Sequence, residues 1–538
     1  MSKKLVSILL LALSCVFLAW MVFSSVGQQR LSQLYVSSDT WNELMSARER
    51  FEPSKDQTTL FGEVYFNGYA LAFDQSQQML MYSLIEDSPE AYDPFVRVSP
   101  KHIYARVAVM GGEISDEMIR HNESIQLMVY TPNYYAVYQL KCTTLPILEV
   151  EKAPWELSTE TSHTRIKLFD NRKEAVNRTL VSTAAMHVRG RVSRKYPKNS
   201  YKMVLQTESA GNNWRNRHVS LLGLRQDDDW ILNCVYSDRD KVREVFTTNL
   251  WYESCADNNE FGVKNGMEYR YVEAFYGEQY WGLYALGSPI DEKQLELKNG
   301  EHIYRKIDHY TQETDIDFEK PGPVQGYEYR GGNLENPDWE PLRLYYQTLL
   351  SPSTEIGEEL YKIADVENAM DILLFLNLIQ GIDHAHLRGN NTIYNLYLTA
   401  KRASDGTLKI LYTPWDMDNS WGIVFGWYIL DPSAHVIIDT NIVKRLLELG
   451  DEQMAKRLID HYWELRAGAW SEENTERMLL ELEADVYDSG AYAREYDMWL
   501  QGQASSQDVK LSEFIDYVHA RLKHMDDYIN NLAQEWNL

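Results

Sequence analysis

The sequence predicts a mixed α+β protein made of several domains. Its 538 residues are too many for one hydrophobic core, and at about 150 residues each they predict roughly three or four domains. Short segments that alternate apolar and polar residues, such as GEVYFNGYALAF and IYARVAVM, indicate β-strands over residues 60–160. After residue 440, apolar residues recur every three or four positions, as in RMLLELEADVY, which indicates helices.

The composition narrows the class of protein. Hydrophobic residues make up 44% of the chain, aromatic residues 12% and charged residues 25%, which is typical of a folded globular protein. The formal net charge of −26 argues against a nucleic-acid partner, because such a partner needs a basic surface. An acidic overall field instead favours divalent cations or basic partners.

The first 30 residues are expected to form a membrane anchor. Lys3 and Lys4 precede a run from Leu5 to Val26 without a charged residue, which is long enough for a helix across a bilayer. A signal-peptide core usually has only about 7–15 residues. Apolar residues also continue past Cys15, so an uncleaved anchor is favoured over a cleaved signal peptide or a lipoprotein signal. The lysines should stay inside, which predicts a single-pass cell-membrane protein with the bulk of its chain extracytoplasmic.

Two segments without evident chemistry follow. Residues 31–59 are expected to form a polar, helical stalk, and residues 60–150 a small β domain that acts as a spacer or docking module. Beyond the anchor, the three cysteines Cys142, Cys234 and Cys255 are typical of small buried side chains rather than of a disulfide scaffold. Export would permit a bond between Cys234 and Cys255, which flank a predicted helix, so this pair is a hypothesis.

A dense basic segment lies inside this acidic protein. Gly190 stands between two arginines, the first of which is Arg189, and glycine lets a backbone approach a phosphate closely. Lys198 and Lys202 are spaced so that one face of the predicted strand NSYKMVL carries both. Arginine guanidinium groups and a lysine on a strand are the side chains expected to bind a polyphosphate. The alternative is a solvated basic face that pairs with the surplus acid.

A second segment, from Asp383 to Gly422, gathers acids and amides. Asp416 and Asp418 follow a predicted strand two residues apart, and an extended chain would point both side chains the same way. Oxygen ligands of this kind suit Mg²⁺ or Mn²⁺. Asp383, then Asn390 and Asn391, then the paired acids follow the order of a phosphoryl-transfer site. The alternative is a solvated turn that an aspartate caps.

Five segments in this order resemble the CotH kinase family, the spore coat protein H-like atypical protein kinases: VRGRVSRKYPKNSYKMVL, DWILNCVYSDRDKVR, YGEQYWGLYAL, GIDHAHLRGNNTIYNLYL and TPWDMDNSWG. The C-terminal helices also resemble the family's ending, so the resemblance spans roughly residues 145–535. It implies a kinase-like domain over residues 151–440 that binds ATP and Mg²⁺ or Mn²⁺ between a β-rich lobe and a helical lobe. Residues 441–538 are then the C-terminal helical part of that domain.

The resemblance also implies roles for individual residues. Asp383 matches the catalytic or positioning acid, Asp416 matches the metal ligand, and Asp418 is a second acid that shares the metal. Asn391 and Asn390 rank above Asn395 as amide ligands. The family's basic motif and lysine strand match four residues, of which the last is the preferred phosphate ligand: Arg189, Gly190, Lys198 and Lys202.

The expected function is transfer of the ATP γ-phosphoryl group to a Ser or Thr of an exported or envelope protein. The alternative is a catalytically idle surface protein that acts in adhesion or in envelope or coat assembly. The family usually carries a glutamate where this chain has Leu286 to Pro289, which favours the alternative. The presence of Asp383 and Asp416 favours the kinase.

Overall fold

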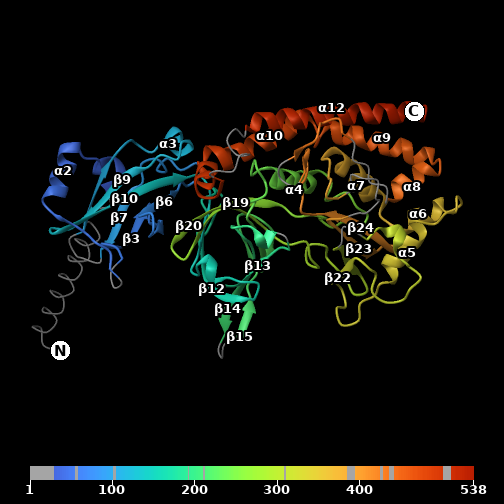
Figure 1. Cartoon of the computed structure of the whole chain (residues 1–538), viewed down its shortest axis with the longest axis horizontal. Coiled ribbons are helices and arrows are strands. Elements are labelled where there is room, and N and C mark those ends of the chain that lie inside the picture. The colour runs from blue at the N-terminus through green and yellow to red at the C-terminus, as the bar shows by residue number, and fades with distance from the viewer. Residues whose placement is uncertain are drawn as a thin grey trace, which may run out of the picture.

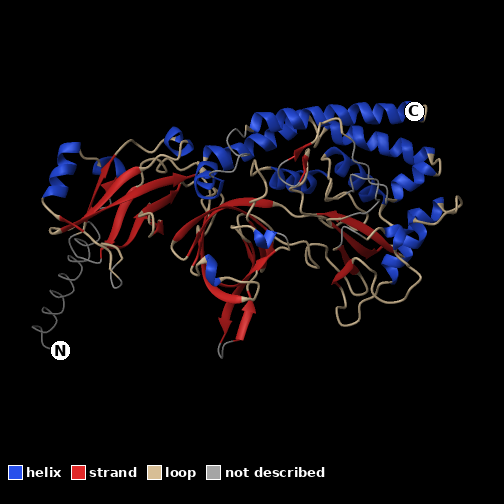
Figure 2. Ribbon diagram, viewed as in Figure 1, coloured by secondary structure: helices blue, strands red, loops and turns tan. Residues whose placement is uncertain are grey.

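The computed structural model describes residues 29–54, 58–100, 105–191, 193–209, 213–307, 311–384, 394–424, 428–434, 441–500 and 510–538. Three regions lie side by side along the long axis of this part of the chain (Figure 1): an N-terminal β region, a closed sheet in the middle, and a C-terminal region in which helices cover a small sheet. Figure 2 shows that helices gather over the C-terminal half, whereas strands dominate the other two regions.

The N-terminal region consists of two sheets that enclose one core. The first sheet has the order β1 (Gln29–Arg30), β7 (Phe95–Pro100), β3 (Phe61–Phe66) and β4 (Tyr69–Ala70). The second has the order β5 (Ala72–Asp74), β6 (Met79–Ser83), β10 (Tyr134–Thr143), β9 (Ile125–Tyr130) and β8 (Arg106–Met110), and β2 (Glu49–Arg50) pairs with β10. Apolar side chains from alternate strand positions, such as Phe66 and Leu140, fill the core between them.

Part of the segment expected to form a stalk belongs to this region. The strand β2 pairs with β10, and the helix α2 (Ser38–Ser46) packs Trp41 against the second sheet. The region also contains a short helix, α3 (Asp116–Arg120). The domain boundaries at residues 60, 150 and 440 stay predictions.

The middle region is an eight-stranded sheet that closes on itself. Its order is β13 (Thr179–Arg189), β12 (Ser162–Phe169), β11 (Ile147–Val150), β19 (Tyr269–Tyr276), β20 (Gln279–Gly287), β18 (Asp229–Asn233), β14 (Ser200–Ser209) and β15 (Asn213–Asn216). Because β13 also pairs with β14, the sheet forms a ring from which β15 projects. Alternate residues point inward, so Met186, Tyr201, Trp230 and Tyr284 fill the interior.

The C-terminal region builds helices around a four-stranded sheet with the order β22 (Tyr327–Gly331), β21 (His302–Lys306), β23 (Leu396–Arg402) and β24 (Leu408–Pro414). The helices are α4 (Arg243–Ser254), α5 (Glu340–Leu349), α6 (Gly357–Ile363), α7 (Val366–Leu378), α8 (Ile442–Glu448), α9 (Glu452–Ala467), α10 (Glu472–Glu483) and α12 (Leu511–Glu535). Two-stranded pairs join β16 (Val219–Ser220) to β17 (Gln226–Asp227) and β25 (Ile423–Val424) to β26 (Tyr428–Ile429). Asp365, Asp451 and Ser471 begin three of these helices, because their side chains accept a backbone N–H of the first turn.

The short helix α11 (Ala491–Glu495) ties the three regions together. Arg494 forms two hydrogen bonds of 2.6 and 2.8 Å to Glu273 of β19 and also donates to the carbonyl of Cys142 in β10. Glu495 bonds Lys198, which precedes β14. Charged contacts from one turn of chain therefore add to the hydrophobic core that the closed sheet shares with the helices.

The prediction of a mixed α+β fold is confirmed, whereas two other expectations need correction. Among the described residues, no helix is long and apolar enough to cross a membrane. The expected anchor over Leu5–Val26 lies outside those residues, so the membrane helix, the membrane partner and the single-pass location are not supported. Cys234 and Cys255 are buried free thiols, so the hypothesised disulfide is not formed.

Candidate active site

The turn after β24 carries the paired aspartates. The strand ends at Pro414, and Asp416 adopts a left-handed backbone conformation with φ of 60°. The chain is therefore not extended there, contrary to the expectation from the sequence. Aspartate tolerates this conformation better than most residues. Asp416 is exposed and Asp418 is half-buried, while Met417 between them is buried in the core.

Asp383 reaches the same place from the turn that follows α7. The side-chain amide of Asn419 donates 3.1 Å to Asp383 Oδ2 and 3.0 Å to Asp418 Oδ1, so one amide joins the two acids. Burial raises the pKa of Asp383, and the hydrogen bond from Asn419 partly offsets that rise. The structure thus brings together acids that lie 35 residues apart in the sequence.

His384 holds the two turns together rather than acting as a ligand. Its Nε2 lies 3.0 Å from the backbone carbonyl of Trp415, and the ring is completely buried. Burial lowers the pKa of His384 to about 4, so the imidazole is neutral at physiological pH and donates to that carbonyl.

A third segment, between β18 and α4, completes the site. The Ser237 hydroxyl donates 2.8 Å to Asp418 Oδ2. Asp238 accepts the backbone N–H of Glu244 at 3.2 Å, and the carboxylate of Glu244 accepts the backbone N–H of Met417. Sequence analysis did not assign these residues, although the acid-rich run SDRDKVRE, next to a motif of the family resemblance, was a usable signal.

The carboxylates at this site repel one another strongly. Burial raises the pKa of Asp418 to about 8, and the charges of Asp416, Asp383 and Asp238 add to that effect against the hydrogen bond from Ser237. Burial also raises the pKa of Asp238 to about 6.

For Glu244, the pKa rises well above its usual value because of burial, and the charges of Asp416 and Asp418 add to the rise. A divalent cation among these oxygens would favour their ionised forms, and a set of carboxylate oxygens is the donor set that Mg²⁺ or Mn²⁺ prefers.

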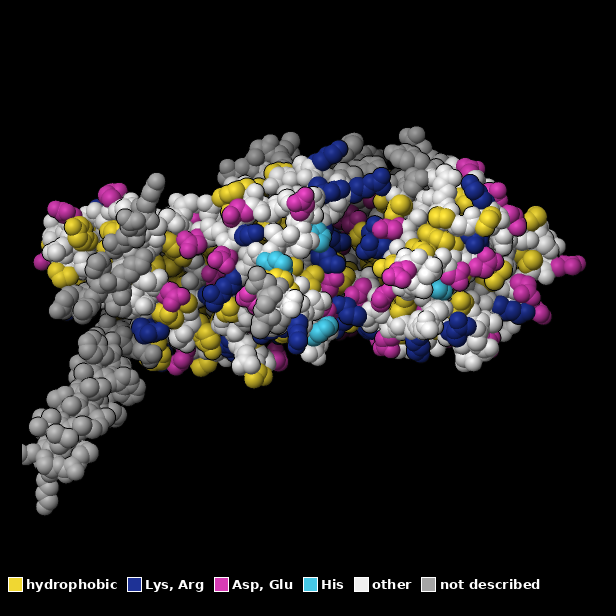
Figure 3. Space-filling view, turned by 90° about the horizontal axis from the view of Figure 1, so that it is seen from below, with side chains coloured by type: hydrophobic (Ala, Val, Ile, Leu, Met, Phe, Trp, Pro, Cys, Tyr) yellow, Lys and Arg dark blue, Asp and Glu magenta, His cyan; other side chains and the backbone are white. Residues whose placement is uncertain are grey.

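Basic side chains border the carboxylates at the end of β13. Arg189 is near enough to Tyr269 to lower its pKa, although burial and the charge of Glu244 raise it. Arg191 donates 2.8 Å to the carbonyl of Ile307. Between these arginines, Gly190 has φ of 103°, and a Cβ there would clash with the hydroxyl of Ser193. On the face in Figure 3, basic and acidic side chains lie next to one another near the middle of the molecule.

The two strand lysines are placed differently from each other. Lys198 has a completely buried side chain, whose Nζ lies 2.7 and 2.8 Å from the carboxylate oxygens of Glu495. Burial lowers the pKa of Lys198, and Glu495 opposes that shift. Lys202 lies beside His187 on the outside of the closed sheet, is partly exposed, and pairs with Asp229 at 2.8 Å.

The amides predicted as ligands are only partly visible. Asn390 and Asn391 lie outside the described residues. Asn395 is buried at the start of β23 with φ of 51°, and its backbone carbonyl accepts the N–H of Trp415 at 3.2 Å. Its backbone therefore supports the turn that carries Asp416.

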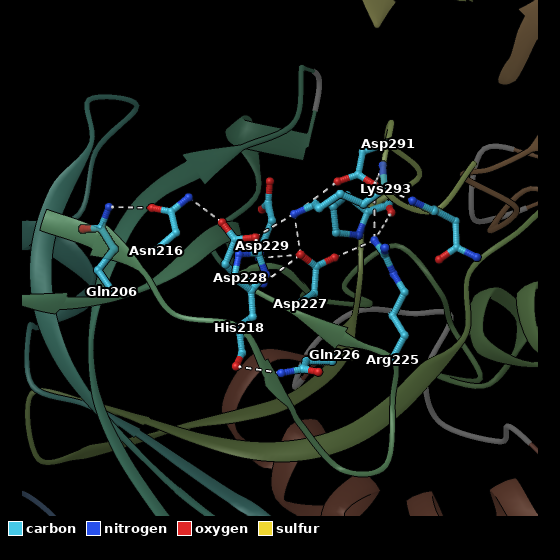
Figure 4. Close-up of polar contacts among 12 residues, drawn as sticks. Gln206, Asn216, His218, Arg225, Gln226, Asp227, Asp228, Asp229, Asp291 and Lys293 are labelled. Atoms are coloured by element: carbon cyan, nitrogen blue, oxygen red, sulfur yellow. Dashed lines mark hydrogen bonds and ion pairs between the residues drawn. The ribbon is translucent and has the colours of Figure 1, made fainter. Parts of the chain in front are cut away.

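In a separate acidic cluster, lysine and arginine side chains already pair with the carboxylates (Figure 4). His218, Asp227 and Asp228 form the one group of three side chains in the described chain whose potential metal-binding atoms all lie within 4.8 Å of one another. Lys293 reaches Asp228 at 2.8 Å and also bonds Asp227, which Arg225 contacts at 2.5 Å. Burial opposes ionisation of Asp228, but Lys293 lowers its pKa below the usual value. The Lys293 ammonium therefore already balances the charge of both aspartates.

A comparison with protein-family models found a match over this part of the chain. A family model described as CotH kinase protein matches residues 186–525, which is more than half of the chain. The matched range contains every acid and base of the site, from Arg189 to Glu495. No curated protein matches the chain.

Proposed function

Because the chain belongs to the CotH kinase protein family, we propose that it transfers the γ-phosphoryl group of ATP to the hydroxyl of a protein Ser or Thr, with Mg²⁺ or Mn²⁺ as cofactor. One observation carries the proposal: three separate segments meet at Asp418, because Asn419 bonds both Asp383 and Asp418 while Ser237 bonds Asp418 from a third segment. An aspartate that only caps its own solvated turn would not need hydrogen bonds from side chains of other segments.

The residues fit a divalent cation. Asp416 and Asp418 would hold it, with Asn391 and Asn390 as the expected amide ligands. When bound, the cation would neutralise charge on the β- and γ-phosphates of ATP. The fit rests on the crowded carboxylates and on a buried Glu244 oxygen, Oε2, that has no hydrogen-bond partner.

Asp383 would orient the acceptor hydroxyl and take its proton. The bond from the hydroxyl oxygen to the γ-phosphorus forms as the bond from that phosphorus to the ADP oxygen breaks, and ADP leaves with the electron pair. A raised pKa makes the Asp383 carboxylate a better base than an ordinary one. Because a hydroxyl is a weak acid, its proton would move to Asp383 late in the reaction, and Asp383 would contribute mainly by positioning the hydroxyl.

The phosphates would lie against the end of β13. Arg189, with Gly190 after it, and Lys202 flank His187 on the same pair of strands. Lys198 is proposed to act indirectly, since Glu495 holds it inside the protein. The acceptor was expected to be an exported or envelope protein, but that expectation rested on the membrane anchor and is withdrawn with it.

Thermal shift and transfer assays on the full chain test the proposal. ATP with Mn²⁺ should raise the melting temperature of the wild type, and a concentration of 100 times Kd corresponds to about 2.7 kcal/mol of stabilisation. Asp416→Asn should lose that shift. Asp383→Asn should keep it, yet lose transfer of radiolabelled phosphate to casein or to the protein itself. Asp405→Asn, an exposed aspartate before β24, is the matched control.

Equal ligand shifts in the wild type and Asp416→Asn would show the metal assignment to be wrong. Absence of any shift with ATP and either metal would refute the kinase proposal. It would support a second candidate, a non-catalytic family member, which the burial of Lys198 favours because that lysine has no route to a phosphate.

A further inference from the structure

The carboxylate of Glu244 is buried beside the acids of the site and is only half satisfied. Its side chain lies in the first turn of α4, and the residue is 2% exposed. The carboxylate accepts the backbone N–H of Met417, the residue between the paired aspartates. Its oxygen Oε2 is buried and has no hydrogen-bond partner. A buried carboxylate oxygen without a hydrogen-bond partner lowers the stability of the folded protein, so it indicates a ligand that binds there.

This position is built by several contacts between α4 and the turn after β24. Arg243 donates 3.0 Å to the carbonyl of Trp421, whose indole N–H donates 2.9 Å to the Thr247 hydroxyl. Thr247 also lies 3.1 Å from the hydroxyl of Ser420. The first two turns of α4 are therefore fixed against the aspartate turn, and Glu244 is directed at it by the backbone.

The basic side chains around Glu244 are engaged elsewhere. Arg243 pairs with Asp240 at 2.6 Å. Lys241 donates to the carbonyl of Val235 at 2.8 Å and lies 4.0 Å from Glu495. In the described part of the chain, no ion pair reaches Glu244. No described side chain balances this carboxylate, and a bound cation would do so.

We propose that Glu244 is a further ligand of the divalent cation held by Asp416 and Asp418. Oε2 offers the oxygen, while the N–H of Met417 keeps the carboxylate oriented toward the turn. Three carboxylates from two structural elements then surround one cation, which suits Mn²⁺ and Mg²⁺. The proposal rests on the proposed function, because it adds a ligand to the same cation.

Mn²⁺ alone, without nucleotide, is the probe. Titration of the full chain is followed by the electron paramagnetic resonance signal of free Mn²⁺, which disappears on binding. Glu244→Gln keeps the shape and an acceptor for Met417 but removes the charge. It should weaken Mn²⁺ binding roughly tenfold or more, since even outer contacts of a metal site are worth that much. Glu253→Gln, an exposed glutamate on the same helix, should bind like the wild type.

Melting without metal separates a ligand from a structural role. Removing one of several crowded carboxylates relieves repulsion, so Glu244→Gln should melt at the wild-type temperature or above it. If Glu244→Gln binds Mn²⁺ as the wild type does while Asp416→Asn does not, this inference is overturned and the proposed function stands. If the wild type itself binds no Mn²⁺, this inference is overturned as well, whereas the proposed function is decided by the melting shift with ATP and metal.

Discussion

The buried pair of Lys198 and Glu495 allows a quantitative prediction. Both side chains are 0% exposed, and the Lys198 ammonium contacts both oxygens of the carboxylate at 2.7 and 2.8 Å. The carboxylate also accepts the N–H of Leu283 at 2.9 Å, and Lys241 lies 4.0 Å away. Removing one member of such a pair leaves an uncompensated buried charge, which costs about 3–5 kcal/mol.

The two single substitutions should not cost the same. Glu495→Gln deprives two buried ammoniums of their carboxylate, so its cost should lie at the upper end of that range. Lys198→Met leaves Glu495 within 4.0 Å of Lys241, so its cost should lie at the lower end. The double variant should be more stable than the sum of the two losses predicts, with a coupling energy of about 1–3 kcal/mol.

Urea unfolding followed by tryptophan fluorescence measures these costs. The ring centroids of Trp281 and Trp499, two of the 15 tryptophans, lie 4.9 Å apart at this contact, so both contribute to the fluorescence change on unfolding. Lys173→Met, which breaks an exposed pair with Asp87, should leave the unfolding midpoint unchanged. Strictly additive losses, or single losses no larger than that control, would refute the reasoning.

Three further predictions concern other contacts. His461→Gln should destabilise the protein more at pH 6 than at pH 9. Burial opposes the charge of His461, but the carboxylate of Asp371 at 2.5 Å raises the pKa of His461. The stabilisation from this ion pair is therefore complete below pH ~6.5 and is lost as pH rises through the folded-state pKa of His461. Melting curves at both pH values check this. Gly190→Ala should lower the free energy of unfolding by about 1–3 kcal/mol in urea titrations, because it combines a left-handed backbone with a clash against Ser193. Lys293→Met should destabilise the closed sheet and let added Ca²⁺ restore part of the loss, whereas Ca²⁺ should not change the melting temperature of the wild type through this cluster.

Part of the candidate site was predictable from the sequence. Acids and amides in a fixed order pointed to Asp383, Asp416 and Asp418, and the structure joins two of them through one asparagine. Alternation of apolar residues likewise predicted the strands before residue 145. Both signals are local, since they depend on residue type and on spacing within one segment.

The remaining features depend on contacts that no local pattern reveals. Lys198 looked like a phosphate ligand because of its spacing, yet its partner lies 297 residues further along the chain. The role of Glu244 depends on the packing of α4 against a turn more than 170 residues away. The left-handed backbone of Asp416 could not be predicted either, because the local sequence is equally compatible with the end of a strand.

The contact between Glu495 and Lys198 also sets an order of events during synthesis. At about 5–20 residues per second, a ribosome needs roughly 15–60 s to add the 297 residues between them. Until then, the loop before β14 holds a lysine that has no carboxylate to bury against. The nascent chain therefore cannot bury Lys198 in its final environment until α11 has emerged from the ribosome.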